Sequence, residues 1–553
     1  MKNDVFTFLV GGKAGEGVKK AGSVVAHIFS RMGRYVFQMD DYMSLIRGGH
    51  NFSVVSTSTR WISSQYMNAN LIVNFDKRSS QVHNNDIAEN GIVVFNSDEQ
   101  EDVEGIGIPL SSEADKYTMK KLMYGVGAVA ILASTIGFKK SEMNDIIKNE
   151  YPSGIEDNIK FADTIYDLVK NECENKFPLE KGDKERVIIT GNESISLGAV
   201  AGGLNAYYGY PMTPASTILH FLARHAKEFG LAVVHAENEL AVINMAIGSA
   251  FSGAKSMVGT SGGGFALMTE GFSLAGMTEA PVLVVLSQRP GPATGVPTYT
   301  EQADLSFALT AGHGDFLRIV ASPGTIEDAY YLASEMLELV WKFQTPGILL
   351  TEKHLSESSM TVEINVEDAK WAEPKLHQGG EYKRYLNTED GVSPLLFPPS
   401  KEIIKWDSYE HNEHGITTED AQTIQFMHNK RGKKINALID YLKNKTTVNI
   451  TQGEHPLNIF SYGSTYMSVL EALKYGKINP TVIQPIYLNP LPIWELEKFK
   501  DQKNIVVEQS FTGQFSNLLK EKAGIPIKAI IKKYDGRPFD PIELYTRIKE
   551  VAE

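Results

Sequence analysis

Residues 282–298, which read VLVVLSQRPGPATGVPT, join an apolar stretch to a loop that is stiffened by three prolines. The first part, Val282 to Leu286, contains no polar residue, as expected for a parallel strand that helices cover on both faces. In open α/β sheets, ligands bind at the carboxyl ends of the strands, which is where this loop begins. The stretch therefore predicts a parallel α/β fold with a binding site near Arg289, whose guanidinium can hold a carboxylate through two parallel hydrogen bonds.

Strand and helix signals alternate along most of the chain, which indicates a multidomain α/β protein. A length of 553 residues leaves room for three or four domains. We expect an N-terminal α/β domain over residues 1–175, a charged linker over 176–186, a second α/β domain over 187–360, an irregular connecting segment over 361–450 and a C-terminal α/β domain over 451–553.

The charge balance excludes some classes of protein. Lys and Arg number 54 against 67 Asp and Glu, which gives a formal net charge of −13 and argues against a nucleic-acid binder. The uncharged run over residues 122–138 is shorter than the roughly 20 residues that span a bilayer. We therefore expect neither a nucleic-acid partner nor a membrane segment.

The single cysteine, Cys173, lies in the charged stretch that precedes Val187. One thiol excludes an intrachain disulfide framework, a cysteine-based zinc site and an iron–sulfur cluster held by this chain alone. We expect Cys173 to be inert and the protein to be cytoplasmic, because a chain of this kind suits a reducing compartment.

Two glycine clusters lie near the N-terminus. The loop Gly11–Gly17 lies between an apolar strand and a helix, where backbone N–H groups can hold an anion. It matches neither the dinucleotide nor the P-loop spacing, so a strand-to-helix turn without a ligand is an equal alternative. The second cluster, Arg47-Gly48-Gly49-His50, could place a cation and a ring near a partner, or could form an ordinary solvent-facing turn.

Three motifs of the second block carry candidate site residues. In Tyr210-Pro211-Met212-Thr213-Pro214, two prolines hold a threonine hydroxyl, which fits a rigid pocket wall. Glu237 and Glu239 precede and open a helix of small residues that another chain or a flat cofactor could approach. Residues 260–265, Thr260-Ser261-Gly262-Gly263-Gly264-Phe265, form a glycine loop with two hydroxyl groups. Taken alone, each could be an ordinary turn or a solvated first helical turn.

A histidine pair occurs in Glu410-His411-Asn412-Glu413-His414. Its spacing could suggest a metal site, but no helical pattern supports two histidines on one face. We therefore expect a surface loop and predict no metal site on this chain.

These motifs, in this order, resemble those of the 2-oxoacid:ferredoxin oxidoreductases. The α-type motifs are YPMTP (210–214), ENELA (237–241), TSGGGF (260–265) with MTEG (268–271), and QRPGPATGVPT (288–298). The γ-type motifs are GGKAGEGV (11–18) and IRGGH (46–50), and VVEQSFTGQF (506–515) and KYDGRPF (533–539) resemble the C-terminal domain. The order γ then α is that of the fused large subunit that acts on 2-oxoglutarate or on a broad range of 2-oxoacids. Two departures are Met212 where Ile is usual and Gly263 where Pro is usual.

The resemblance implies a fold and roles for individual residues. The three α/β domains would be a γ-type domain, a domain similar to the pyrimidine-binding domain of thiamine enzymes, and a transketolase-C-like domain. Glu239 would bond the aminopyrimidine ring of thiamine diphosphate and promote its imino tautomer, with Glu237 as the competing choice. Arg289 would pair with the 2-oxoacid carboxylate, Thr213 would bond its carboxylate or carbonyl side, and Thr298 would line the same pocket. The implied cofactor-binding residues are Glu239, Thr260, Ser261 and Gly262.

The resemblance also implies a second subunit. The chain has no Gly-Asp-Gly (GDG) motif for the diphosphate and Mg²⁺, and one cysteine cannot hold an electron relay. A separate β subunit would supply the GDG motif, the Mg²⁺ and a 4Fe-4S cluster, and would share thiamine diphosphate with this chain. The expected reaction is the coenzyme A (CoA)-dependent oxidative decarboxylation of a 2-oxoacid to acyl-CoA and CO₂, with electrons passing to ferredoxin.

Several alternatives stay open on the sequence alone. The same family includes enzymes that prefer pyruvate, branched-chain 2-oxoacids or indolepyruvate, and the assembly could be αβ or (αβ)₂. A different reading, a non-catalytic dinucleotide-binding regulator, rests on the loop Gly11–Gly17 and leaves the motifs around Tyr210 and Arg289 unexplained.

Overall fold

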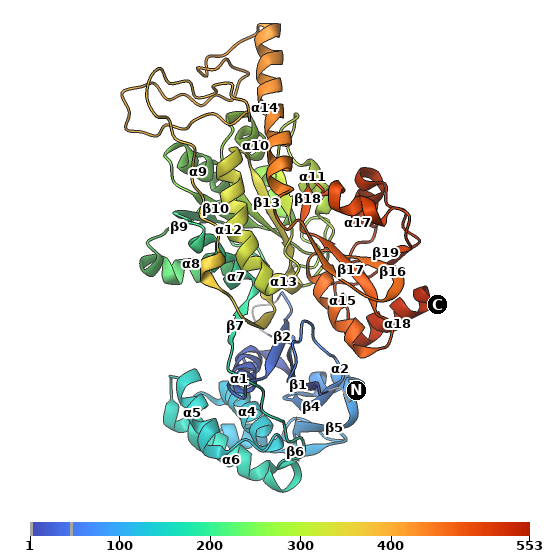
Figure 1. The fold of residues 1–553 in the computed structure, drawn as a ribbon. Helices are drawn as coiled ribbons and strands as arrows, with labels where there is room; N and C mark the ends of the chain where they lie inside the picture. Colours follow the sequence, from blue (N-terminus) through green and yellow to red (C-terminus); the bar gives the residue numbers. More distant parts are fainter. Residues whose placement is uncertain (1–3, 45–47) are drawn as a thin grey trace. The chain divides into compact units, whose positions relative to one another are not determined.

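The computed structural model describes residues 4–44 and 48–553 and divides the chain into two compact units (Figure 1). The first unit comprises Met1–Ile189, Glu357–Glu363 and Asp540–Tyr545; the second comprises Thr190–Ser356, Ile364–Phe539 and Thr546–Glu553. The named strands lie in three sheets of eight, seven and five strands, with helices between many of the successive strands. The multidomain α/β fold that the sequence predicts is confirmed.

The first unit is built on the eight-stranded sheet, which has the order β6-β5-β4-β1-β3-β2-β14-β7. Its central strand β1 runs parallel to β4 and antiparallel to β3, so the sheet is mixed. A strand from far along the sequence, β14, pairs with β2. The strands are β1 (Phe6–Ala14), β2 (Tyr35–Asp41), β3 (Gly48–Ser58), β4 (Ala69–Asn74), β5 (Ile87–Asn96), β6 (Ile106–Ile108), β7 (Val187–Thr190) and β14 (Ser359–Val362).

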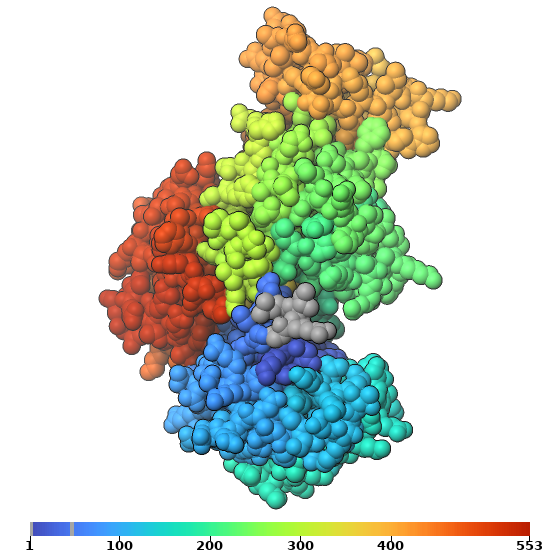
Figure 2. Space-filling view, turned by 180° about the vertical axis from the view of Figure 1, so that it is seen from behind, coloured from blue at the N-terminus to red at the C-terminus, as the bar shows by residue number. Residues whose placement is uncertain are grey.

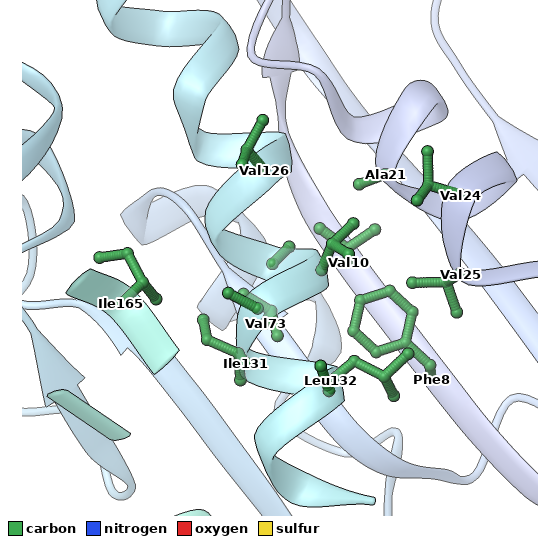
Figure 3. Close-up of a cluster of buried hydrophobic side chains, with 14 of the residues drawn as sticks. Phe8, Val10, Ala21, Val24, Val25, Val73, Val126, Ile131, Leu132 and Ile165 are labelled. Carbon is green, nitrogen blue, oxygen red and sulfur yellow. The ribbon is translucent and has the colours of Figure 1, made fainter. Parts of the chain in front are cut away.

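The core of the first unit lies where helices cover β1 and β4. The helix α4 (Met123–Thr135) is apolar on every face and fully buried, as expected for a helix enclosed by other elements. Val10, Val73 and Leu132 are among the side chains that meet in this core, where α1 and α4 face the two strands and α6 packs against α4 (Figure 3). The other helices of this unit are α1 (Val18–Arg31), α2 (Lys77–His83), α3 (Leu110–Ala114), α5 (Lys140–Glu150) and α6 (Ile155–Cys173).

The second unit contains the seven-stranded sheet, with the order β18-β12-β13-β11-β10-β8-β9. All neighbouring strands from β12 to β9 are parallel, and β18 pairs antiparallel at one edge. The strands are β8 (Ala206–Gly209), β9 (Ala232–His235), β10 (Ser256–Thr260), β11 (Leu283–Gln288), β12 (Ile319–Ala321), β13 (Gly347–Glu352) and β18 (Tyr487–Asn489). The helices are α7 (Gly191–Ala201), α8 (Ser216–Phe229), α9 (Glu239–Phe251), α10 (Gly262–Thr278), α11 (Leu305–Thr310), α12 (Ile326–Phe343) and α13 (Lys353–Glu357).

The five-stranded sheet of the second unit has the order β15-β17-β16-β19-β20. Its core is continuous with that of the seven-stranded sheet, because Phe460 and Val506 belong to the same buried cluster as Val284. The strands are β15 (Val448–Thr451), β16 (His455–Phe460), β17 (Pro480–Pro485), β19 (Asn504–Glu508) and β20 (Ala529–Lys532). The helices are α15 (Ser464–Tyr475), α16 (Ile493–Leu496), α17 (Gln514–Leu518) and α18 (Pro541–Ala552).

The segment 361–450 contains a long helix as well as irregular chain. The helix α14 (Ala421–Leu442) lies beside the irregular residues that precede it, and both belong to one packed body (orange in Figure 2). It is anchored by a buried ion cluster, in which Lys430 Nζ lies 2.6 Å from Glu279 Oε1 and Lys434 pairs with the same carboxylate. Although burial opposes ionisation, the two lysines hold the pKa of Glu279 well below its usual range.

The charged stretch before Val187 is part of the first unit. The Arg186 side chain is buried and forms ion pairs with Asp183 and Glu363, at 2.8 and 2.7 Å. Cys173 is the last residue of α6 and is buried, not part of a free linker, and burial raises the pKa of its thiol. In the part of the chain that the structure describes, no helix is long and apolar enough to cross a membrane.

Candidate functional site

The carboxyl ends of the parallel strands bring the predicted motifs to one edge of the seven-stranded sheet. The registers pair Thr260 with Leu286 and Gln288 with Glu352, so β10, β11 and β13 end side by side. The strands β8 and β9 continue the same parallel set. This is the edge at which open α/β sheets bind ligands.

Glu239 is the first residue of α9 and points into the protein. Asn238 caps this helix, because its side chain accepts a hydrogen bond from Ala241 N at 2.9 Å. The Glu239 side chain is only 3% exposed, and its Oε1 has no hydrogen-bond partner among the described residues. The competing residue, Glu237, is exposed. A buried carboxylate oxygen without a partner is costly, so Glu239 is the better candidate to contact a ligand.

The glycine loop after β10 lies against Glu239. A Cβ atom on Gly264 would come within 2.6 Å of Glu239 Oε1 and would overlap the Thr260 hydroxyl. Ser261 is the N-cap residue of α10, yet its hydroxyl makes no capping bond and has no partner among the residues that the structure describes. Three polar groups therefore lie around the start of α10: Glu239 Oε1 and the Ser261 hydroxyl, neither of which has a partner among the described residues, and the Thr260 hydroxyl.

The motif 210–214 contacts the Arg289 loop through the protein backbone. Arg289 Nη1 donates to the carbonyl oxygen of Thr213 at 2.7 Å, and the Thr213–Pro214 peptide bond is cis. Tyr210 and Pro211 are exposed, and the Met212 sulfur lies 4.0 Å from the Thr260 hydroxyl. The structure thus brings Thr213 and Arg289 together as the sequence suggests, but through the Thr213 carbonyl.

Arg289 directly follows β11 and is half-buried. Burial lowers the pKa of Arg289, and the charge of Asp304 acts in the opposite direction. Thr298, on the same loop, is 4% exposed, and the structure shows no polar contact between its hydroxyl and either Arg289 or Thr213, all of which it describes. Its place in the same pocket therefore stays a prediction.

Three acidic residues near this edge were not among the candidates from the sequence. Burial raises the pKa of Asp304 to about 6 and that of Glu301 to about 7. Burial also raises the pKa of Glu352 to about 7, and its Oε1 accepts a hydrogen bond from Ser464 N at 2.7 Å. Glu301 and Asp304 follow the loop 288–298 closely, and this position could have marked them as candidates in the sequence. Their burial, however, is visible only in the fold.

The glycine loop of the first unit holds a carboxylate of its own. Glu16 is 2% exposed and accepts a hydrogen bond from Lys13 N at 2.8 Å, so a carboxyl group of the loop itself occupies the loop before α1. Burial raises the pKa of Glu16. This arrangement disfavours an anion at the loop and thus weakens the dinucleotide reading.

The other N-terminal cluster is only partly visible. Arg47 lies outside the described residues. His50 Nε2 lies 2.8 Å from His83 Nε2, and His83 Nδ1 lies 2.8 Å from Asp86 Oδ2. Burial lowers the pKa of His50 to about 4.

The histidine pair near residue 410 is not a simple surface loop. His411 is fully buried and stacks on Tyr385 with ring centroids 3.8 Å apart, while the side chain of His414 is 43% exposed. Among the residues that the structure describes, no group of three or more His, Cys, Asp or Glu side chains is arranged to hold a metal ion.

Comparisons with known proteins add the family. Residues 197–430 match the thiamine-diphosphate-binding family model of pyruvate flavodoxin/ferredoxin oxidoreductases, and residues 7–168 match a second model, pyruvate ferredoxin/flavodoxin oxidoreductase. The α subunit of a 2-oxoacid:ferredoxin oxidoreductase from Sulfolobus sp. is 29% identical over 99% of this chain and 97% of its own length. A 2-oxoglutarate synthase subunit from Archaeoglobus fulgidus is 30% identical over 58% of this chain and 87% of its own length.

A solved structure agrees over the whole chain. The 2-oxoglutarate:ferredoxin oxidoreductase from Magnetococcus marinus, with 2-oxoglutarate, coenzyme A and succinyl-CoA bound, superposes with a TM-score of 0.91 at 29% identity and covers 100% of both chains. The chain therefore belongs to the 2-oxoacid:ferredoxin oxidoreductase family, corresponds to its α subunit, and carries the thiamine-diphosphate-binding domain of that family.

Proposed function

We propose that this chain is the catalytic large subunit of an enzyme that oxidatively decarboxylates 2-oxoglutarate, or a broad range of 2-oxoacids, to acyl-CoA. The observation that carries the proposal is Glu239 Oε1, which has no hydrogen-bond partner among the described residues and lies beside Gly264, inside the domain that matches the thiamine-diphosphate-binding model. The relative from Magnetococcus marinus, with 2-oxoglutarate and coenzyme A bound, supports this substrate class.

The residues around the start of α10 fit thiamine diphosphate. When bound, this cofactor supplies the carbon nucleophile and electron sink that allow a 2-oxoacid to lose CO₂. Glu239 would hold a proton at Oε1 and bond a ring nitrogen of the cofactor, which would satisfy its orphaned oxygen. Thr260, Ser261 and Gly262 would line the cofactor, with the Ser261 hydroxyl free to bond it because it does not cap α10. Burial keeps bulk water away from this carboxylate.

Arg289 would bind the carboxylate that all 2-oxoacids share. One guanidinium N–H is fixed on the Thr213 carbonyl, which orients the remaining donors for a bidentate grip. The Thr213 hydroxyl and Thr298 would complete the pocket walls. Pyruvate, branched-chain 2-oxoacids and indolepyruvate are the alternative substrates, and walls contributed by a second subunit would decide among them.

A β subunit would cover the site and complete it. Three large apolar side chains are exposed on the helices that begin at Glu239 and Gly262: Leu240 and Met245 on α9 and Leu267 on α10, at 48%, 42% and 49%. Exposed apolar side chains that gather on one face mark interaction surfaces. This partner would bring the GDG motif, Mg²⁺ and the 4Fe-4S cluster, since the one buried cysteine cannot hold the cluster. Ferredoxin would accept the electrons, and we place the complex in the cytoplasm.

The test is co-purification of the tagged chain followed by an activity assay. We expect a small cysteine-rich partner with a GDG motif to copurify. The complex should reduce ferredoxin only when a 2-oxoacid, coenzyme A and thiamine diphosphate are all present. Fast turnover without coenzyme A, or tight nicotinamide-dinucleotide binding by a chain that purifies alone, would contradict the proposal and favour the regulator reading.

A further inference from the structure

Two C-terminal motifs, residues 506–515 and 533–539, form hydrogen bonds to the loop that carries Arg289. The first motif begins in β19 and the second directly follows β20, and both strands run parallel to β16 in the five-stranded sheet. The register pairs Glu508 with Lys532, so the turns after these strands emerge at one edge of the sheet. Neither motif contributes a residue to the proposed site.

The substrate loop, residues 289–304, joins β11 to α11 and has Arg289 as its first residue. Its base is closed, because Asp304 N donates to Gln288 Oε1 at 2.9 Å. Its tip, residues 291–296, is exposed. An exposed tip has few buried contacts of its own, so the contacts of the remaining residues decide how firmly the loop is held.

Backbone groups in the second half of the substrate loop bond to the two C-terminal motifs. Thr300 N donates to the Gly536 carbonyl at 3.1 Å, and Gln302 N donates to the Gln509 carbonyl at 2.6 Å. Both donor residues are buried. Buried backbone N–H groups require partners, and here the turns after β19 and β20 supply them.

The side chain of Gln302 extends this connection to a third turn. It is fully buried, and its Nε2 donates to the carbonyl oxygen of Tyr462, after β16, at 2.8 Å. Its Oε1 accepts hydrogen bonds from Thr465 Oγ1 at 2.8 Å and from Gln509 N at 3.0 Å. One amide therefore joins the substrate loop to two turns of the five-stranded sheet. Any movement of the loop would leave buried polar groups unpaired, which is costly.

The second motif also contacts the substrate loop next to Arg289. Gly536 has a φ of 79°, and a Cβ atom on it would come within 3.1 Å of Tyr299 Cβ and 3.7 Å of Pro290 Cγ. Pro290 directly follows Arg289. The Arg537 guanidinium lies over the Tyr299 ring, 3.7 Å from its centroid. The C-terminal motifs thus hold the loop at both of its ends.

We propose, on the basis of the proposed function, that Gln302 is a positioning residue that locks the substrate loop to the five-stranded sheet and so keeps Arg289 ready for the 2-oxoacid carboxylate. A loop that also populates other conformations reduces the apparent affinity by the fraction of molecules that are competent to bind. Bound substrate selects the competent conformation, so turnover at saturation changes little. Gln302 therefore acts on KM and hardly on kcat.

The test compares Gln302→Leu with Gln484→Leu in the complete complex. Gln484 is the matched control, because it is also fully buried and its amide bonds Ser322 and Asn449, which lie outside the substrate loop. Both variants should have a lower melting temperature, since each leaves buried partners unpaired. Only Gln302→Leu should raise the KM, by about tenfold for 2-oxoglutarate and for pyruvate alike, if about a tenth of the molecules stay competent. Its kcat should fall less than about twofold.

A double variant tests whether Gln302 acts through Arg289. With the guanidinium removed, the position of the loop no longer matters for the substrate carboxylate. The kcat/KM of Arg289→Ala/Gln302→Leu should therefore equal that of Arg289→Ala within about twofold. Thr465→Val is a milder variant that removes one bond of the Gln302 amide and should raise the KM about two- to fivefold.

The possible results separate the positioning role from the proposed function. A Gln302→Leu complex that melts earlier but keeps the wild-type KM, or effects that multiply in the double variant, would overturn the positioning role alone. If Gln302→Leu does not fold, an unchanged KM in Thr465→Val would overturn it in the same way. A wild-type complex that turns over no 2-oxoacid would overturn the proposed function itself.

Discussion

Two strand–glycine–helix turns, one in each unit, can be compared residue by residue. In the first, β1 leads into α1, and the Glu16 carboxylate accepts a hydrogen bond from Lys13 N at 2.8 Å. In the second, β10 leads into α10, and Ser261 Oγ and the neighbouring Glu239 Oε1 have no partner among the described residues. The first turn supplies an acceptor to its own Lys13 N, whereas the second leaves buried oxygens for a ligand.

The difference shows which feature of such a turn predicts binding. Both sequences are rich in glycine, and both lie between a buried strand and a helix. What separates them is whether the loop supplies an acid that folds back onto its own backbone, as Glu16 does, or whether the acid comes from another helix, as Glu239 does. Since native proteins pair their buried polar groups, orphaned oxygens are a stronger indication of a ligand than a glycine count.

The largest effect is expected at Glu239. Glu239→Gln should reduce turnover by about 10²–10⁴-fold in the complete complex, because the amide cannot exchange a proton with the cofactor ring. Glu237→Gln is the matched control, since that side chain is exposed and should change turnover less than about twofold. Steady-state kinetics of both variants decide between the two acids. A crippled Glu237→Gln beside a mild Glu239→Gln would reverse the assignment.

The next largest effect is expected at Arg289. Arg289→Ala should weaken 2-oxoacid binding by about 2–5 kcal/mol, because the substrate carboxylate would lose a half-buried cationic partner. The KM should rise for both 2-oxoglutarate and pyruvate, while bound thiamine diphosphate is retained. Arg289→Lys should recover only part of the lost affinity, because a lysine ammonium lacks the planar fork of donors with which a guanidinium can bond the Thr213 carbonyl and a carboxylate together. A loss confined to 2-oxoglutarate would show that Arg289 binds the distal carboxylate instead.

Substitutions of Glu16 in the first unit should change the stability of the protein and leave its turnover unchanged. Glu16→Ala should reduce the free energy of unfolding by about 1–3 kcal/mol, because Lys13 N would lose its acceptor. Glu16→Gln keeps an acceptor and should be milder. Since burial raises the pKa of Glu16, the free energy of unfolding of the wild type decreases as pH rises through that pKa. Glu16→Gln does not titrate, so its stability relative to the wild type should increase over the same pH range. Denaturant titrations at pH 5 and pH 8 measure both effects; an altered KM for 2-oxoacids would contradict the assignment.

The sequence predicted the regular elements of this comparison well. The apolar run Val282 to Leu286 corresponds to β11 (Leu283–Gln288), and the helix expected after the loop Gly11–Gly17 corresponds to α1 (Val18–Arg31). Such elements can be predicted from local features, namely the spacing of apolar residues and the glycines at the ends of strands and helices. The motifs 210–214 and 288–298 could also be placed at one edge, because parallel strands share a direction.

Features that depend on distant partners could not be predicted. Lys430 and Lys434 look like solvent-facing residues of a charged helix, yet both are buried on Glu279, about 150 positions earlier. The strand β14 joins the sheet of the first unit from far along the chain. The raised pKa of Asp304 likewise follows from burial against Gly262, which no local pattern shows. In each case the pairing is tertiary, and sequence spacing carries no information about it.

The smallest effect is expected at Gly263, and it tests how tightly the second turn is packed. A Cβ atom on Gly263 would meet only the Ala293 carbonyl oxygen, at 3.9 Å, so Gly263→Ala should stabilise the protein by about 0.4–1 kcal/mol by restricting the unfolded chain. The neighbouring Gly264→Ala is the contrast, because its Cβ would overlap the Thr260 hydroxyl and press on Glu239. Thermal melts should therefore show a higher melting temperature for Gly263→Ala and a lower one for Gly264→Ala, and turnover should fall only in Gly264→Ala. If Gly264→Ala is as stable and active as Gly263→Ala, Glu239 does not lie against this turn, and the orphaned carboxylate cannot be part of a site built around the start of α10.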